Sequence, residues 1–165
     1  MIVVSDTTPL NYLILIGEVE LLPKLFGDVI VPPAVIRELL HPKAPHTVQA
    51  WAALPPSWIR LQAPMAIHPS TVLLDPGETE AISLAAEIKA DLILIDERRA
   101  TRVAQQAGLV VVRTVALLET AADRGLIDLA NTFKKLAATS FRVPNEQVAA
   151  ALVRDAQRKA SRKTL

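Results

Sequence analysis

Short apolar runs alternate along this chain with longer segments in which apolar residues recur at helical spacing. Four runs rich in β-branched residues predict strands at 2–4, 29–31, 92–95 and 110–112. A weaker run at 59–61 predicts a fifth strand. The runs are continuously apolar, which is typical of parallel strands buried on both faces. The pattern therefore predicts an α/β fold around a central, mostly parallel sheet of four to five strands.

Helical patterns fill the intervals between these strands. The first is expected to have Thr8 as its N-cap, Pro9 at its first helical position and Gly17 at its end. Residues 75–90 carry a clear apolar stripe at helical spacing. Further helices are predicted within 33–41, 97–108, 114–125, 126–138 and 144–160, with a weaker one at 46–53.

Composition narrows the class of protein. The chain has 165 residues, 51% hydrophobic and 21% charged, which is typical of one globular domain rather than a disordered chain. It has no cysteine, and this excludes disulfide scaffolds, thiolate zinc sites and cysteine nucleophiles. The net charge of +1 neither requires nor excludes a nucleic-acid partner. The sequence also lacks the GxGxxG and GxxxxGK[ST] motifs of nucleotide-binding folds.

The opening segment is apolar but does not match a signal peptide, because it lacks a basic start and Asp6 interrupts it. No stretch approaches the 18 uncharged apolar residues of a membrane span. We therefore expect a cytoplasmic protein with no membrane association.

Acidic residues follow two of the predicted strands. Asp6 follows the run at 2–4, and Asp96 follows the run at 92–95. The carboxyl ends of parallel strands meet at one edge of a sheet, where ligands bind in such folds. Glu38 and Glu78 lie on helices that also connect to this edge. Four carboxylates in one cleft repel each other, and a divalent cation such as Mg²⁺ or Mn²⁺ resolves that conflict.

Each acid also has an ordinary interpretation. Asp6 and Asp96 are equally suited to cap the helices that follow them. Glu38 fits a solvated helix face beside Arg37, and Glu78 fits the first turn of a helix, where the dipole favours negative charge. No single position decides between a metal site and these local roles.

The acids lie in motifs that resemble those of a known family. The segments are VVSDTTPL, VIRELL, LDPGETEAISLAAE and LILIDERRA. Together they resemble the PIN-domain ribonucleases, especially the VapC-like toxins and a prokaryotic sub-branch with a DTTPL-type start. The resemblance covers residues 1–125 and implies a three-layer α/β/α nuclease domain. Residues 126–165 are then expected to form a C-terminal helical extension of the same domain with a basic tail.

The resemblance implies a metal-dependent endoribonuclease that hydrolyses RNA phosphodiester bonds. Asp6, Glu38, Glu78 and Asp96 are expected to be both the catalytic residues and the ligands of one or two Mg²⁺ or Mn²⁺ ions. Glu78 stands where many family members have aspartate, and it keeps the charge. An alternative is a catalytically weak or inactive PIN fold that binds RNA or protein.

Supporting roles follow from the same resemblance. Thr7 is expected to orient Asp6 or a metal-bound water, with a local cap as its other interpretation. Glu97, where a second aspartate is common, is expected to add a hydrogen bond around the site. Three arginines, Arg98, Arg99 and Arg102, fit a phosphate clamp or a solvated face. The expected partners are an RNA substrate, a cognate antitoxin protein and a second copy of the chain in a homodimer.

Overall fold

The computed structural model describes residues 1–163 and separates into two compact units. The first comprises residues 1–114 and the second begins at Val115, and each is described here by itself. Thr164 and Leu165, at the end of the predicted basic tail, lie outside the described residues. The predicted division at residue 125 into a nuclease domain and an extension stays a prediction.

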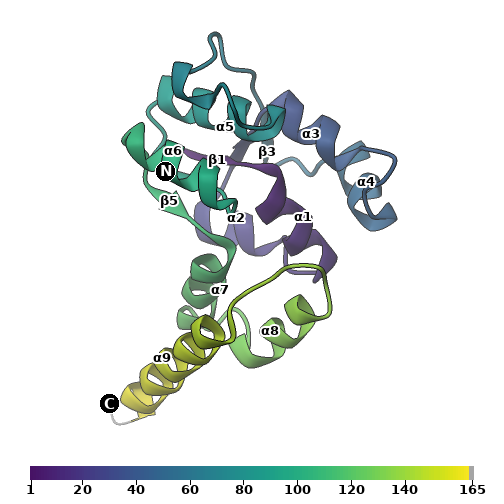
Figure 1. The fold of residues 1–165 in the computed structure, drawn as a ribbon. Helices are drawn as coiled ribbons and strands as arrows, with labels where there is room; N and C mark the ends of the chain where they lie inside the picture. The colour runs from purple at the N-terminus through teal and green to yellow at the C-terminus, as the bar shows by residue number, and fades with distance from the viewer. Residues whose placement is uncertain (164–165) are drawn as a thin grey trace. The chain divides into compact units, whose positions relative to one another are not determined.

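The first unit is built on a five-stranded, all-parallel sheet (Figure 1). The strands are β1 (Val3–Ser5), β2 (Val29–Val31), β3 (Ile59–Leu61), β4 (Leu92–Leu94) and β5 (Val111–Val112). Their order across the sheet is β3-β2-β1-β4-β5, so β1 is the central strand and β4 lies beside it. The predicted α/β fold is confirmed, and the weak run at 59–61 is the fifth strand.

Helices connect the strands of the first unit. They are α1 (Thr7–Leu15), α2 (Leu21–Phe26), α3 (Pro33–Leu39), α4 (His46–Ala53), the 3-10 turn η1 (Pro69–Thr71), α5 (Pro76–Glu87) and α6 (Arg98–Gln106). The second unit holds most of α7 (Thr114–Asp123), together with α8 (Leu129–Ala137) and α9 (Asn145–Lys163). Among the helices of residues 1–163, none is long and apolar enough to cross a membrane.

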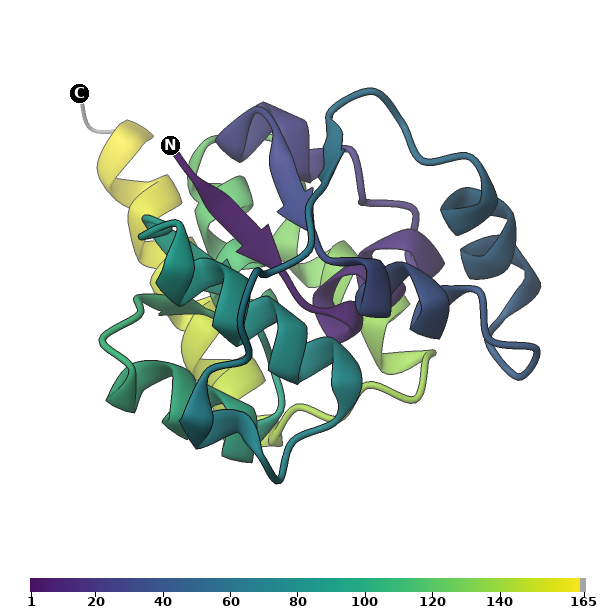
Figure 2. The same ribbon diagram turned by 90° about the horizontal axis from the view of Figure 1, so that it is seen from above.

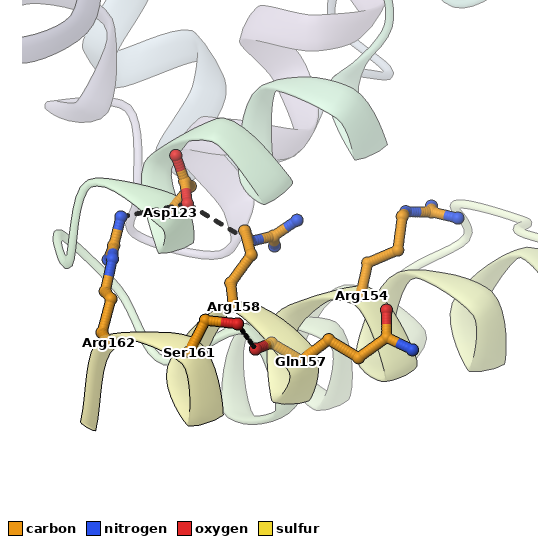
Figure 3. Close-up of a pocket in the computed structure, with 6 residues that line it drawn as sticks. All are labelled: Asp123, Arg154, Gln157, Arg158, Ser161 and Arg162. Atoms are coloured by element: carbon orange, nitrogen blue, oxygen red, sulfur yellow. Dashed lines mark hydrogen bonds and ion pairs between the residues drawn. The ribbon is translucent and has the colours of Figure 1, made fainter. Parts of the chain in front are cut away.

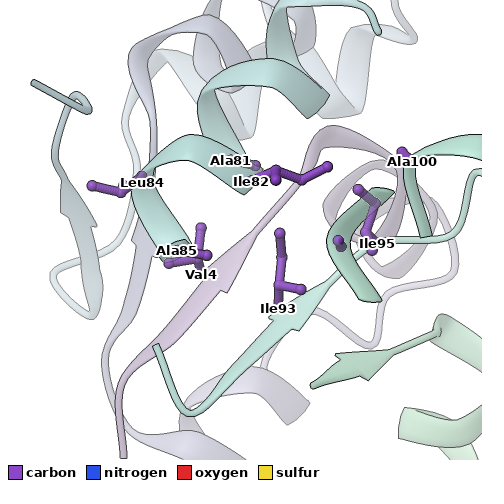
Figure 4. Packing of buried hydrophobic residues seen from close by; sticks show 9 residues of the cluster. Val4, Ala81, Ile82, Leu84, Ala85, Ile93, Ile95 and Ala100 are labelled. Carbon is purple, nitrogen blue, oxygen red and sulfur yellow. The ribbon is translucent and has the colours of Figure 1, made fainter. Parts of the chain in front are cut away.

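The central strands are buried on both faces. Val3 and Val4 point to opposite faces of β1, and both are 0% exposed. On the face of Val4, the helix α5 packs along β1 and β4 through Ala81 and Ile82, next to Ile93 (Figures 2 and 4). This burial explains why the strands are continuously apolar, as a sheet covered on two sides requires. It also fixes the first turn of α5 near the carboxyl end of β1.

Basic residues of α9 form ion pairs within the second unit. Arg158 and Arg162 both pair with Asp123, at 3.3 and 3.1 Å (Figure 3). Arg154 pairs with Glu119 at 2.9 Å. These arginines line a pocket along α9. The basic residues of this predicted tail whose side chains the structure describes therefore form ion pairs with nearby carboxylates. Such pairs at the surface contribute little to stability individually.

Candidate metal centre

Asp6 lies where β1 passes into α1. Its backbone amide donates to the carbonyl oxygen of Leu94 at 2.9 Å, which extends the pairing between β1 and β4 by one residue. The helix begins at Thr7, so Asp6 rather than the expected Thr8 occupies the N-cap position. Its side chain nevertheless makes no capping hydrogen bond to the described residues. The interpretation of Asp6 as a simple helix cap is therefore not supported.

The carboxylate of Asp6 is buried without adequate compensation. The residue is 1% exposed, and its Oδ1 has no hydrogen-bond partner among residues 1–163. Burial raises the pKa of Asp6 well above its usual value, the backbone amide of Thr7 opposes this, and the carboxylates of Glu78, Asp75 and Glu38 raise it further. An unpartnered buried carboxylate is costly unless a cation or a proton balances it.

Glu38 is turned toward the same place. It lies near the end of α3, where it accepts a hydrogen bond from the hydroxyl of Thr7 and one from the amide of Gly77 at 2.7 Å. Thr7 thus holds Glu38, which is a different contact from those expected from the sequence. The neighbouring Arg37 pairs instead with Glu80 at 3.2 Å. Glu38 is therefore tied to the first turns of α1 and α5 and is not a freely solvated residue.

Gly77 allows this close approach. A Cβ atom added at position 77 would lie 2.8 Å from both Cδ and Oε1 of Glu38, which is closer than real Cβ atoms come. A side chain at position 77 would therefore require the Glu38 carboxylate, the end of a flexible side chain, to move. Glu38 accepts a hydrogen bond from the amide of Gly77 in the first turn of α5, where the helix dipole favours negative charge.

The N-terminus of α5 carries two more acids in a capping box. Oδ1 of Asp75 accepts from the amide of Glu78 at 2.9 Å, and Oε2 of Glu78 accepts from the amide of Asp75 at 3.3 Å. Asp6, Glu38 and Asp75 each offer one carboxylate oxygen, and these three oxygens lie within 4.8 Å of one another. Asp75 is not among the metal ligands predicted from the sequence. The signal available was the D-x-x-E pattern, which places Asp75 at the N-cap, beside the acid that was singled out.

Glu78 belongs to the same acidic neighbourhood although its oxygens lie outside that triad. It is 6% exposed. Burial raises its pKa to about 7, and the carboxylates of Asp75, Glu97 and Glu38 contribute, while the hydrogen bond from Asp75 lowers it. Glu78 therefore carries a proton more readily than an exposed glutamate.

Asp96 ends the adjacent strand but has different partners. Its Oδ1 accepts from the amide of Thr114 at 2.9 Å and its Oδ2 from the hydroxyl of Thr114 at 2.5 Å. Burial raises its pKa, and the hydrogen bonds from Thr114 and the charge of Arg113 oppose that rise. The N-cap of α6 is Glu97, whose Oε2 accepts from the amides of Arg99 and Ala100 at 2.6 and 2.8 Å. Asp96 is thus not the cap of α6, and Glu97 has a local capping contact.

The predicted basic clamp lies on α6, directly after Asp96 and Glu97. Its members, Arg98, Arg99 and Arg102, are all exposed. They are accessible to a large anionic ligand.

Carboxylate oxygens are the ligands that Mg²⁺ and Mn²⁺ favour. The triad offers three of them, and the Asp6 carboxylate also has a buried oxygen, Oδ1, that no group within residues 1–163 satisfies. The residues present therefore fit a divalent metal centre at the carboxyl end of β1.

Comparison with known proteins agrees with this assignment. A family model described as DUF3368, PIN domain, matches residues 2–157. The chain therefore belongs to the PIN-domain family, whose members are generally metal-dependent nucleases. Among curated proteins and solved structures, none matches the chain significantly.

Proposed function

We propose that this protein is a metal-dependent endoribonuclease that hydrolyses RNA phosphodiester bonds, and that it is the toxin of a toxin–antitoxin pair. One observation carries the enzymatic part. The buried Asp6 has an oxygen without a hydrogen-bond partner in the part of the chain that the structure describes, and it lies among the carboxylates of Glu38 and Asp75 at the carboxyl end of the central strand. Such an arrangement is unfavourable for a metal-free protein and favourable for one that holds Mg²⁺ or Mn²⁺.

The side chains around the triad support the same chemistry. Thr7 and Gly77 hold Glu38 by hydrogen bonds on both of its oxygens, so its orientation is set before any ligand arrives. Thr114 likewise fixes Asp96 at the adjacent strand end. A divalent cation, when bound, supplies activation of water and neutralisation of charge on the phosphodiester.

RNA is proposed as the substrate on the strength of the family resemblance and of the exposed arginines on α6. Arg98 and Arg99 follow the acidic strand end by two and three residues, and Arg102 lies one turn further. Guanidinium groups suit the bidentate recognition of phosphate oxygens. They therefore offer a way to hold the backbone of a nucleic acid beside a centre whose own charge is negative.

The biological setting is proposed from the resemblance to VapC-like toxins. A toxin of this kind acts in the cytoplasm, forms a homodimer and is inhibited by a cognate antitoxin protein. Co-expression of the gene with its neighbour is the direct test. Growth arrest by the chain alone, relieved by the neighbouring gene product, supports the proposal, and growth unaffected by the chain contradicts the toxin role.

The nuclease activity is tested with purified protein on fluorescently labelled RNA. Cleavage is expected with Mn²⁺ and not with EDTA, and it should be lost in Asp6→Asn and in Asp96→Asn. The matched control is Asp28→Asn, because Asp28 is an exposed aspartate whose contact is a surface ion pair with Arg60. Cleavage that survives in Asp6→Asn contradicts the proposed centre. RNA binding without cleavage by the wild type would favour the inactive binding module instead.

A further inference from the structure

Two acids at the N-terminus of α5, Asp75 at the N-cap and Glu78 in the first turn, are candidates for the third metal ligand. The family resemblance points to Glu78, whereas the geometry points to the residue that precedes the helix. We propose that Asp75 completes the carboxylate set with Asp6 and Glu38, and that Glu78 is a positioning residue that holds Asp75. This inference rests on the proposed metal-dependent function.

The proximity of the carboxylate oxygens distinguishes Asp75 from Glu78. Oxygens of Asp6, Glu38 and Asp75 lie within 4.8 Å of one another, and those of Glu78 are not part of this group within residues 1–163. The independent observation is the buried, unpartnered Oδ1 of Asp6. A cation bound to the Asp6 carboxylate would have those of Glu38 and Asp75 as its neighbours.

Glu78 contacts the backbone of Asp75 rather than the triad oxygens. Its Oε2 reaches back to the backbone amide of Asp75, 3.3 Å away, as the N3 residue of a capping box does. The same box holds Asp75 from the other side, because the amide of Glu78 donates to its Oδ1 at 2.9 Å. Glu78 therefore fixes both the backbone and the carboxylate of Asp75.

The amide of Gly77, in the same helical turn as Glu78, contacts a second carboxylate of the triad. Gly77 donates to Glu38 at 2.7 Å, so the first turn of α5 places two of the three carboxylates at once. Asp75 retains a second oxygen that the capping bond does not use. The side chain of Asp75 would therefore be both the N-cap of α5 and a metal ligand. Binding of the cation would then stabilise the first turn of α5.

The test is calorimetric titration of Mn²⁺ into metal-free full-length protein at one fixed pH. Asp75→Asn keeps a good N-cap, since asparagine caps helices as well as aspartate does, but removes the charge. We expect it to weaken Mn²⁺ binding by roughly 100-fold or more, the same effect expected of Asp6→Asn, because loss of a residue that only supports a ligand costs about 10- to 100-fold.

Variants of Glu78 separate a ligand from a positioning residue. Glutamine also serves at N3 of a capping box, so Glu78→Gln should stay within about threefold of the wild-type affinity. Glu78→Ala breaks the box and should weaken binding about 10-fold. Unfolding scans in EDTA check that each variant is folded, and Asp28→Asn is the control that should bind as the wild type does.

The possible failures are distinguishable. If Glu78→Gln abolishes binding while Asp75→Asn retains it, Glu78 is the ligand and this inference is wrong, although the metal centre stands. If Glu78→Gln and Glu78→Ala weaken binding equally, the positioning role is wrong. If the wild type binds no Mn²⁺, or if Asp6→Asn binds it normally, the proposed function fails and the inference fails with it.

Discussion

Replacing Asp6 by asparagine should stabilise the metal-free protein. The substitution is nearly isosteric and removes a buried carboxylate that lies among others. One oxygen of this carboxylate has no hydrogen-bond partner among the described residues 1–163. Asparagine also remains acceptable at the N-cap of α1. A residue placed for stability would show the opposite effect, because the loss of a partnered carboxylate at a buried site destabilises a fold.

The magnitude follows from the geometry of the cluster. At the 4.8 Å limit that separates the triad oxygens, two unit charges repel by roughly 3.5 kcal/mol at an effective dielectric constant of about 20. Uptake of a proton relieves part of this repulsion, since the pKa of Asp6 is raised. We therefore expect a net gain of about 1–2 kcal/mol at pH 8, which corresponds to roughly 2–8 °C in Tm for a chain of this size.

The assay is thermal unfolding with EDTA and with Mn²⁺. In EDTA the variant should melt above the wild type. Mn²⁺ at 100 times its Kd should stabilise the wild type by about 2.7 kcal/mol and leave the variant unchanged, so the order of the two Tm values reverses. Asp28→Asn should follow the wild type in both conditions. A variant that melts below the wild type in EDTA would refute the claim that the Asp6 carboxylate is strained in the metal-free protein.

Three further predictions concern the surroundings of the centre. In an ordinary helix, a Gly→Ala change stabilises the protein by up to about 1 kcal/mol. Gly77→Ala should instead displace the Glu38 carboxylate and weaken Mn²⁺ binding. Unaltered binding by calorimetry would contradict the steric role of Gly77. Glu97→Ala removes the N-cap of α6 and should cost about 0.5–2 kcal/mol in denaturant unfolding, whereas a neutral result would mean that the cap contributes nothing. In EDTA, the free energy of unfolding should fall as the pH rises from 5 to 7, because burial raises the pKa of Glu78 from 4.5 to about 7 on folding. This part of the slope should be absent in Glu78→Gln.

The sheet was predictable from sequence because its signal is local. In the four stronger predicted runs every residue is apolar. Both faces of the central strand are buried, as expected for a parallel strand that is covered on two sides. The strand at 59–61 was the weakest of these signals, and it lies at an edge of the sheet, where Arg60 and Leu61 are exposed. Edge strands need fewer apolar residues, so their patterns are fainter.

The sequence predicts that the acids lie at one edge of the sheet, but it does not predict which of them lie in contact. The topology of parallel strands brings Asp6 and Asp96 to one edge whatever their side chains do. The identity of the triad, by contrast, depends on rotamers and on contacts across long stretches of chain. Glu38 accepts from Gly77, 39 residues away, and Asp96 accepts from Thr114, 18 residues away. Such pairings leave no periodicity in the sequence.

The role of Asp75 as a helix cap is evident from the sequence, whereas its proposed role as a metal ligand is not. Its position before Pro76 and three residues before Glu78 is fully explained by a capping box, so nothing in the sequence requires it to do more. The triad becomes visible only when the carboxyl end of β1 and the first turn of α5 are placed beside each other. A residue with a sufficient local explanation is therefore easily passed over as a candidate ligand.

The most direct test of the metal centre is anomalous X-ray scattering from crystals of the protein soaked in Mn²⁺, recorded at the manganese absorption edge. The account predicts an anomalous peak bounded by the carboxylates of Asp6, Glu38 and Asp75, and no such peak in crystals of Asp6→Asn. A peak elsewhere on the protein, or none in the wild type at saturating Mn²⁺, would contradict the claim that these acids form a divalent metal centre.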